Sequence, residues 1–466
     1  MRHRVRIAAL VAWAVLGAVS VPPARGAERF PPPDFTDHTL PEVTEPPPGA
    51  RWPQIPAHVA YEYLDLAALA AGLGLATYLA LVSRSRRGLL VLAAVSLAWL
   101  GFWRKGCICP IGAIQNVSLA IADPSYAIPA FVVALFVLPI VVTLFFGRTF
   151  CAAVCPLGAV QEWAAVWPVR VPAWLDQGLG LLAYVYLGAA VVLASTGTAF
   201  VICEYDPFVG LFRRSATTGM LGLGAGFLIV GLFVARPYCR YLCPYGAILG
   251  LCSKASKYHL RIPPEECIKC RLCEDVCPYG AIWEPTVEQT PRERLRARNR
   301  LAAMLVLLPV LLGAGVLVGR GLAVPLARLH PRVLLAEYLR QAESAPAEET
   351  PPEALSPRLK QRNDALEAFR NTGRPAQEVY DEAAGLVSRF RGLGAWLGAW
   401  VGLVFGAKLI QLSIRRRRAD YQPDRANCVS CGRCFWYCPP EQLRLGLIET
   451  LPVVPGAERS KEGVER

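Results

Sequence analysis

Two runs of four cysteines with the same spacing constrain this chain more than any other feature. Each run follows the pattern C-x2-C-x2-C-x3-C-P, and about 150 residues separate them. The runs are Cys267, Cys270, Cys273 and Cys277, followed by Pro278, and Cys428, Cys431, Cys434 and Cys438, followed by Pro439. The 466 residues hold only 16 cysteines, too few for a small disulfide scaffold. Cysteines in tight groups indicate metal binding instead.

This spacing is typical of bacterial ferredoxins. Three closely spaced thiolates on a tight loop hold three irons of a cubane cluster, while the fourth, aimed away by its proline, ligates the cluster of the other run. The pattern predicts two [4Fe-4S] clusters with crossed ligation. The predicted ligands of cluster 1 are Cys267, Cys270, Cys273 and Cys438. The predicted ligands of cluster 2 are Cys428, Cys431, Cys434 and Cys277. A zinc site is disfavoured, because zinc ribbons use two separated pairs.

Long apolar stretches indicate a membrane protein. A mean hydropathy of +0.35 excludes a disordered chain and an ordinary soluble enzyme. A helix needs about 20 apolar residues to cross a bilayer core of about 30 Å. The stretches that meet or approach this length are 62–82, 88–103, 126–147, 174–197, 217–235, 301–320 and 393–413. The expected fold class is mainly α, a polytopic helical membrane protein with about seven spans after a signal peptide.

The distribution of basic residues predicts the orientation. Residues 1–27 combine early arginines, an apolar stretch and a small-residue end, which is a secretory signal pattern. Arginine clusters follow the first span, precede the sixth and follow the seventh, so alternate threading puts all three on one face. Because lysine and arginine near spans stay in the cytoplasm, we expect a bacterial inner (cytoplasmic) membrane protein. Its N-terminus is exported, and its C-terminus and ferredoxin module are cytoplasmic. The net charge of +13 then reflects topology and anionic lipid, not nucleic acid.

These spans predict the domain organisation. Within the polar segment between the sixth and seventh spans, Pro375 and an acidic first turn predict a helix. The expected segments are a signal peptide (1–27), an exported Pro-rich linker (28–60), a membrane domain with tandem Cys-Pro repeats (61–250), a first ferredoxin half (255–292), a membrane span (301–320), an exported helical segment (321–392), a membrane span (393–413), a second ferredoxin half (419–445) and a cytoplasmic tail (446–466).

Four further cysteines belong to an internal repeat, C-x3-C-P-x-G-A. The repeat occurs once at Cys151 and Cys155 and again at Cys239 and Cys243, each time just cytoplasmic of a predicted span. A tandem duplication about an axis along the membrane normal would gather these four thiols into one inner site. Such a site suits a further iron-sulfur cluster. Thiol-disulfide chemistry and a purely structural helix-turn device are the alternatives.

Three more cysteines fall at the predicted outer face. Cys107, Cys109 and Cys203 would form an outer site in an oxidising compartment, where disulfides persist. The alternatives are a cluster completed by Asp206, a disulfide involving Cys203, and simple packing. The remaining cysteine, Cys252, belongs to no repeat, and we expect a small buried side chain.

Other redox cofactors find little support in the sequence. The five histidines, at 3, 38, 58, 259 and 330, all lie outside the predicted spans, which argues against bis-histidine haem in the bilayer. Nucleotide-binding motifs of the P-loop and Rossmann kinds are absent, so direct NAD(P)H oxidation is not expected. His58 and Glu62, near the outer end of the first span, could serve a quinol head group or could simply be solvated.

Over residues 100–450 the chain resembles the membrane polyferredoxins of the NapH and NosR families. The resemblance rests on paired C-x3-C-P motifs after membrane spans, followed by two ferredoxin runs. It implies a quinol dehydrogenase or an electron conduit to a periplasmic reductase. NosR-like proteins carry an exported flavin-binding domain ahead of the membrane part. Here a Pro-rich segment stands in that place, so a covalent flavin is not implied. The C-x-C-P at Cys107 and the two spans between the ferredoxin runs depart from the simpler pattern.

These observations predict a membrane-bound iron-sulfur protein that passes electrons between a cytoplasmic or quinol donor and a periplasmic reductase or flavoprotein. A bound quinone is an alternative to the outer site as the last step. The protein sets distance and potential, and bond-making chemistry belongs to the partner, so the sequence assigns no catalytic residue. The alternative is an assembly or maturation factor that uses its thiols or electrons to activate an exported metalloenzyme.

Overall fold

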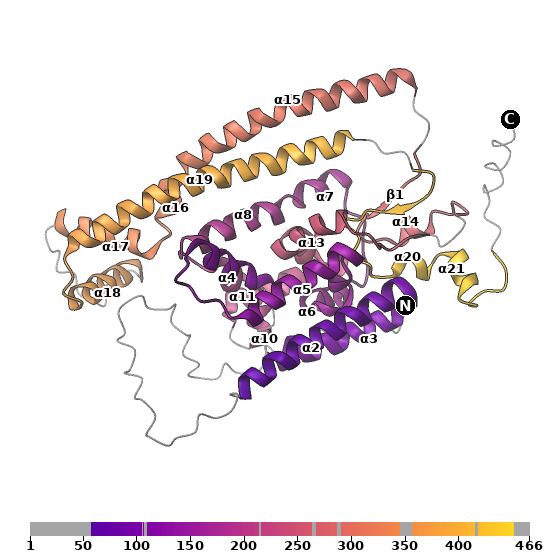
Figure 1. The fold of residues 1–466 in the computed structure, drawn as a ribbon, viewed down its shortest axis with the longest axis horizontal. Coiled ribbons are helices and arrows are strands. Elements are labelled where there is room, and N and C mark those ends of the chain that lie inside the picture. The colour runs from indigo at the N-terminus through magenta and orange to yellow at the C-terminus, as the bar shows by residue number, and fades with distance from the viewer. Residues whose placement is uncertain are drawn as a thin grey trace.

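The computed structural model describes residues 57–104, 106, 110–213, 216–262, 267–286, 290–344, 357–414 and 418–451. The predicted signal peptide, most of the linker and of the tail, and Cys107 and Cys109 lie outside these ranges. Helices make up most of the described chain (Figure 1).

The membrane domain is built from long helices joined by short ones. Three of its helical segments are π-helical and are labelled η. In chain order its elements are α2 (Ala57–Thr77), η1 (Tyr78–Val82), α3 (Arg86–Ser96), η2 (Leu97–Trp103), α4 (Pro110–Ala122), α5 (Ala130–Phe146), η3 (Phe150–Val154), α6 (Pro156–Ala164), α7 (Ala173–Leu179), α8 (Leu182–Ser195), α9 (Val201–Tyr205), α10 (Val209–Arg213), α11 (Thr218–Phe233), α12 (Pro237–Tyr241) and α13 (Pro244–Lys254).

Five described helices are long and apolar enough to cross a membrane. They are Glu62–Val82, Arg86–Trp103, Ala173–Ser195, Pro291–Gly321 and Ala376–Ser413. The third and fifth predicted spans coincide with shorter apolar helices, α5 and α11, of 17 and 16 residues. Proline and glycine set these shorter lengths: α5 begins after Pro129 and ends at Gly147, whose φ is +75°, and α11 ends shortly before Pro237.

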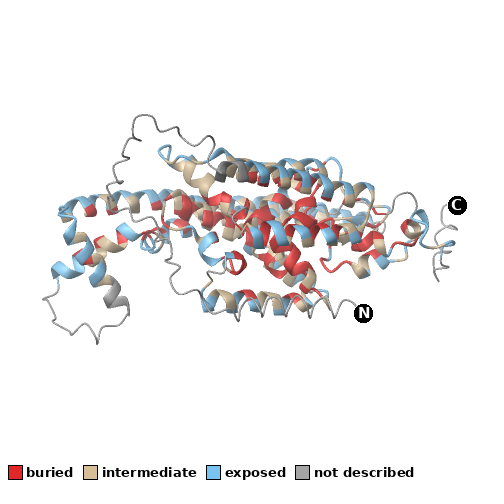
Figure 2. Ribbon diagram, turned by 90° about the horizontal axis from the view of Figure 1, so that it is seen from below, coloured by how far each residue is buried: buried red, intermediate tan, exposed pale blue. Residues whose placement is uncertain are grey.

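The two C-x3-C-P motifs each start a helix in the buried centre of the membrane domain. Cys155 is the N-cap of α6 and Cys243 is the N-cap of α13, and in both cases the following proline is the first helical residue. Proline fits there because the first-turn N–H groups have no partner within the helix. Both helices are lined with buried side chains, among them Leu157 and Tyr245. Figure 2 shows this buried centre, with exposed residues toward the outside.

The rest of the chain forms a long helical hairpin and a small two-part module. Its elements are α14 (Leu272–Val276), β1 (Ile282–Trp283), α15 (Pro291–Gly321), α16 (Ala323–Ala327), α17 (Pro331–Ser344), α18 (Pro357–Asn371), α19 (Ala376–Ser413), β2 (Gln422–Pro423), α20 (Arg433–Trp436) and α21 (Pro439–Arg444). The helix predicted at Pro375 is confirmed, and it continues without a break through the predicted seventh span.

Helices α15 and α19 pack side by side because glycines line their contact (Figure 1). On α19, Gly394, Gly398 and Gly402 follow one another at four-residue intervals and are buried. A methyl group at Gly398 would overlap the carbonyl oxygen of Gly315 on α15. Small residues at this spacing let two backbones approach closely. At one end of the hairpin α16, α17 and α18 pack against the first half of α19 around the buried Phe390.

The two cysteine runs meet at the other end of the hairpin. Strand β1 follows the first run and pairs antiparallel with β2, which precedes the second run, so that Ile282 lies opposite Pro423. The Asp424 N–H donates to the carbonyl of Ala281 at 2.8 Å. The hairpin thus returns the chain to the place it left, and the two halves form one module.

Candidate iron-sulfur centres

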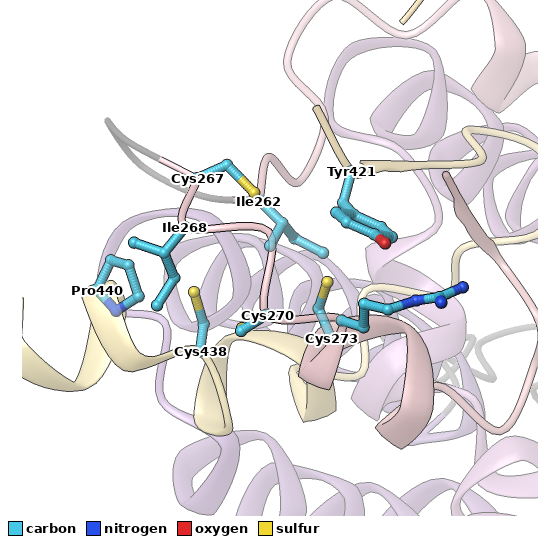
Figure 3. A pocket seen from close by; sticks show the side chains of 9 residues that line it. Ile262, Cys267, Ile268, Cys270, Cys273, Tyr421, Cys438 and Pro440 are labelled. Carbon is cyan, nitrogen blue, oxygen red and sulfur yellow. The ribbon is translucent and has the colours of Figure 1, made fainter. Parts of the chain in front are cut away.

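The first cysteine-lined cavity combines both runs. Cys267, Cys270 and Cys273 surround it from one half of the module, and Cys438 enters from the other (Figure 3). Apolar side chains, Arg271 and Tyr421 complete the wall. We call this cavity 1.

The second cavity reverses the contributions. Cys428, Cys431 and Cys434 line it from the second run, and Cys277 enters from the first. Tyr279 and Arg433 also lie in its wall. We call this cavity 2. The two cavities group the eight cysteines in the way that crossed ligation predicts, although ligation itself stays a prediction.

Left-handed backbone turns aim the thiols of each run at one cavity. Lys269 and Arg271 have φ of +53° and +64°, and the equivalent positions of the second run, Ser430 and Gly432, have +52° and +76°. Residues other than glycine rarely adopt this conformation. Its appearance at matching places in both runs indicates that the loops wind tightly to bring three cysteines together.

The chemistry of both cavities fits a cluster with one thiolate per iron. In the described ranges no three His, Cys, Asp or Glu side chains are arranged to hold a single metal ion; the thiols surround a space, as a cubane requires. Burial raises the pKa of the Cys273 and Cys428 thiols to about 12. Metal-free thiols there would stay protonated, and iron binding would release their protons.

The structure also brings the four C-x3-C-P cysteines together. Cys151 lies in η3 and Cys239 in α12, while Cys155 and Cys243 cap the helices that follow. The Cys243 thiol is within electrostatic reach of the other three. Burial raises the pKa of Cys239 to about 12, and the Gln161 side chain donates a hydrogen bond to its sulfur at 3.2 Å.

Two buried arginines that the sequence reasoning missed flank this four-thiol site. Arg148 and Arg236 each precede the first cysteine of a repeat by three residues. The Arg148 guanidinium lies 3.9 Å from the Cys151 sulfur and donates to the carbonyl of Ala426 at 3.0 Å. Arg236 donates to the carbonyls of Cys151 and Ala152. The fuller repeat, R-x2-C-x3-C-P-x-G, was the available signal.

The glycine of each repeat makes room for the arginine of the other. A Cβ at Gly158 would lie 3.2 Å from the Arg236 guanidinium, and one at Gly246 would lie 3.3 Å from that of Arg148. Each glycine also faces the carbonyl oxygen of the first cysteine of its own repeat. The two repeats therefore interlock, and each places a positive charge against the other.

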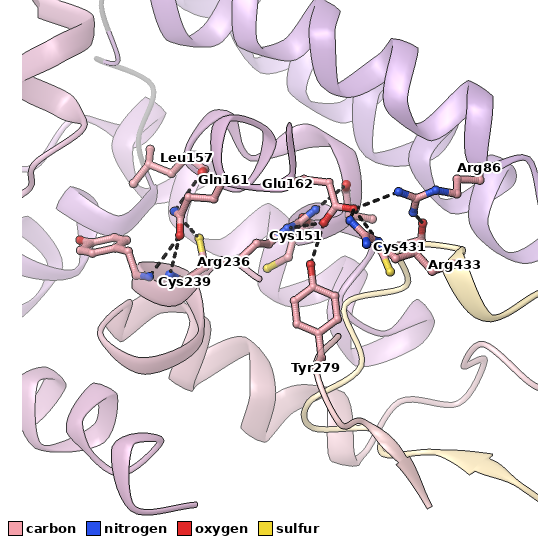
Figure 4. A network of polar contacts seen from close by, with 12 residues as sticks. Arg86, Cys151, Leu157, Gln161, Glu162, Arg236, Cys239, Tyr279, Cys431 and Arg433 are labelled. Atoms are coloured by element: carbon pink, nitrogen blue, oxygen red, sulfur yellow. Dashed lines mark hydrogen bonds and ion pairs between the residues drawn. The ribbon is translucent and has the colours of Figure 1, made fainter. Parts of the chain in front are cut away.

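Glu162 joins the four-thiol site to cavity 2. Its carboxylate accepts hydrogen bonds from Arg236 at 3.2 Å, from Arg433 at 2.8 Å, from Arg86 at 3.2 Å and from the Tyr279 hydroxyl at 2.7 Å. Burial opposes its ionisation, but the three arginines, Arg433 foremost, hold the pKa of Glu162 well below its ordinary value. Figure 4 shows this network between Cys239 and Cys431.

The predicted outer site is only partly visible. Cys203 lies on α9 close to Gly112 of α4, where a Cβ would be 3.1 Å from its sulfur; α4 begins directly after Cys109. Asp206 is buried, and both its oxygens accept hydrogen bonds, from the N–H groups of Phe208 and Val209 and from the Tyr238 hydroxyl. These three hydrogen bonds hold the Asp206 carboxylate in place.

The remaining predicted positions are unremarkable in structure. Cys252 is partly buried on α13 and lies outside the four-thiol site. His58 and Glu62 lie in the first two turns of α2.

Comparison with known proteins places these cysteines in a family. A model described as a 4Fe-4S binding domain matches residues 128–172 and 215–263, which contain both C-x3-C-P motifs, and a second 4Fe-4S binding domain matches residues 260–283. An uncharacterized protein of Methanocaldococcus jannaschii is 30% identical over 188 residues, which are 38% of this chain and 75% of that protein. Protein NirI of Paracoccus denitrificans is 37% identical over 165 residues, and the putative electron transport protein YccM of Escherichia coli is 28% identical over 187.

The chain belongs to the membrane-associated ferredoxin-type electron-transport proteins. The resemblance to the NapH and NosR class is thereby confirmed, since the regulatory protein NosR of Pseudomonas aeruginosa is also among the similar proteins. The matched regions are 32% and 36% of this chain, and they span about a quarter of NirI and half of YccM. No solved structure matches the chain.

Proposed function

We propose that this protein carries electrons through the inner membrane, between a cytoplasmic or quinol donor and a periplasmic reductase or flavoprotein. Two [4Fe-4S] clusters in cavities 1 and 2 and a metal centre at the four-thiol site would form the path. When bound, the clusters would supply one-electron redox chemistry. The protein's own residues would bind them, bury them and set their order.

The observation that carries this proposal is the position of Arg236. Its guanidinium donates to the carbonyl of Cys151 in the four-thiol site and to Glu162, which also accepts from Arg433 in the wall of cavity 2. Buried side chains therefore link both groups of thiols. Electrons cross a bilayer only in short steps between redox centres. Adjacent centres at the membrane face supply the first of these steps.

Arg148 supports a metal centre at the four-thiol site. Its side chain is buried, and among the described residues no carboxylate forms an ion pair with it; the thiols of Cys151 and Cys243 are the groups whose negative charge would stabilise it. Burying an unpaired charge is costly. Thiolates bound to iron would offset that charge, whereas protonated thiols would not.

The basic first turns of α15 support a cytoplasmic module. Arg292, Arg294 and Arg296 lie in the exposed first turns of this helix, a few residues after β1. Arginines at the end of a span are typical of the cytoplasmic side. With the module on that side, the exported reductase or flavoprotein would meet the opposite face, and a quinone remains an alternative for the last step.

Iron counting and transmembrane electron delivery test the path. We expect about ten to twelve irons per chain after anaerobic purification. Cys243→Ser should lower this to about eight and stop electron delivery in vesicles loaded with ferricyanide and given dithionite on the module side. Cys252→Ser, on the same helix but outside the four-thiol site, should change neither. If Cys151→Ser and Cys243→Ser both preserve iron content and delivery, the four-thiol step is wrong, and a role confined to assembly or maturation is favoured.

A further inference from the structure

Four arginines from three different segments gather around cavity 2. Arg433 lies in the sequence between Cys431 and Cys434, which both line cavity 2. Arg86 donates a hydrogen bond to the carbonyl of Cys431 at 3.0 Å. Arg236 is within electrostatic reach of Cys431. Arg240 donates to the carbonyls of Pro278 and Tyr279 at 3.1 and 2.8 Å.

Carboxylates do not balance this positive charge among the described residues. Glu162 is shared by three of the arginines, and Asp176 pairs with Arg240 at 2.7 Å. Asp424, near Cys428, is partly exposed. Arg236 and Arg433 are 1% and 7% exposed, so solvent screens them little. Cavity 2 therefore lies against an excess of buried positive charge.

The charges around cavity 1 are balanced, and those of the Arg271 pairs are largely exposed. Arg271 in its wall pairs with Glu274 and Glu284, and its side chain is 60% exposed. Glu441, near Cys438, pairs with Arg84 and Arg444. Water and ions weaken the exposed Arg271 pairs, and the buried Glu441 carboxylate has two cations beside it. The charged side chains around cavity 1 should therefore neither raise nor lower the reduction potential of a cluster there by much.

Adding one electron makes a thiolate-bound cluster more negative, and nearby positive charge stabilises that state. Burial of a cluster disfavours its more negative, reduced state. The cavities differ in burial by only one buried cysteine, however: three in cavity 2 and two in cavity 1. An unscreened unit charge beside the ligand loop outweighs that difference.

We propose that Arg236 and Arg433, held in place by Glu162, make cavity 2 the higher-potential site of the module and its exit toward the four-thiol site. A single electron would pass from cavity 1, which is oxidised, to cavity 2, which is reduced, with no bond made or broken. The three residues act as positioning residues that tune a potential. This inference rests on the proposed function, because it assigns the order of its steps.

EPR-monitored redox titration of the full chain tests the proposal. The cavity 2 signal is identified by its loss in Cys277→Ala. Arg433→Gln should lower the potential of that signal by about 59 mV, a tenfold change in the equilibrium for one electron. Glu162→Gln should raise it, because a negative charge is removed from the same network. Arg271→Gln, the matched control at cavity 1, should leave the cavity 2 potential unchanged.

Electrostatic tuning predicts that Arg433→Gln and Glu162→Gln shift the cavity 2 potential in opposite directions. A structural defect would shift the potential of both variants in the same direction. Arg433→Lys keeps the charge and should retain the wild-type potential. The proposal is overturned if cavity 1 has the higher potential in the wild type, or if neither substitution moves the cavity 2 signal. If either result is found while Cys243→Ser still blocks electron delivery, only the proposed order of the clusters is rejected. Intact delivery in Cys243→Ser would reject the path itself.

Discussion

Alanine at Cys438 is expected to remove the same cluster as alanine at Cys270, although the two residues belong to different cysteine runs. Each substitution should lower the iron content by about four and abolish one EPR signal. The reason is geometric: both thiols line cavity 1. Cys277→Ala and Cys434→Ala should likewise abolish the other signal, because both line cavity 2.

Double variants sharpen this test. Cys270→Ala with Cys438→Ala should lose no more iron than either single variant, whereas Cys270→Ala with Cys434→Ala should lose both clusters. The double variants are compared with Cys252→Ala, which changes the cysteine count without touching either cavity. Loss of the same signal in Cys438→Ala and Cys434→Ala would show that each run ligates its own cluster, and crossed ligation would be wrong.

Leucine at Gly398 is expected to cost the protein both clusters, although this residue lies far along the hairpin from either cavity. The new side chain would collide with the α15 backbone at Gly315, and overpacking a tight contact costs about 1–3 kcal/mol even where side chains can yield. Helix α19 would be displaced and would carry the second cysteine run with it. Both cavities would then lose the cysteines that the second run contributes to them.

Gly392 on the same helix provides the matched control. A Cβ there has nothing within 4 Å, so Gly392→Leu should keep its iron and its thermal stability in detergent. The measurement is iron content together with the unfolding temperature of both variants. Full cluster occupancy in Gly398→Leu would mean that the module assembles without the close packing of α15 and α19.

Local pattern was enough to predict most of the helical architecture. Hydropathy located five helices of spanning length and two shorter ones, because burial in lipid imposes an apolar composition on every turn. It did not predict the length of α5 or α11, since the prolines and glycine that limit them act through single backbone positions. The helix after Pro375 was predicted by its start signal and the span 393–413 by hydropathy, but not that the two form one unbroken helix.

The cysteine groups were predicted from sequence because their spacing is a local requirement of tight turns around a cluster. The network of charged side chains around these cysteines was not predicted from the sequence. Arg148 and Arg236 repeat at a fixed distance before the first cysteine, a signal that only becomes meaningful once both are seen to be buried. Glu162 has no such signal, because it resembles any acidic residue near the end of a short helix.

The sequence by itself determined the cofactor class, the helical membrane fold and the pairing of the two ferredoxin runs, because each depends on residue types at fixed local spacing. Only the tertiary structure decided which charges accompany which thiols. Glu162 meets Arg236, Arg86 and Arg433 across separations of 74, 76 and 271 residues. A buried carboxylate is stable only when its partners arrive from elsewhere in the fold, so no pattern within one segment can reveal it.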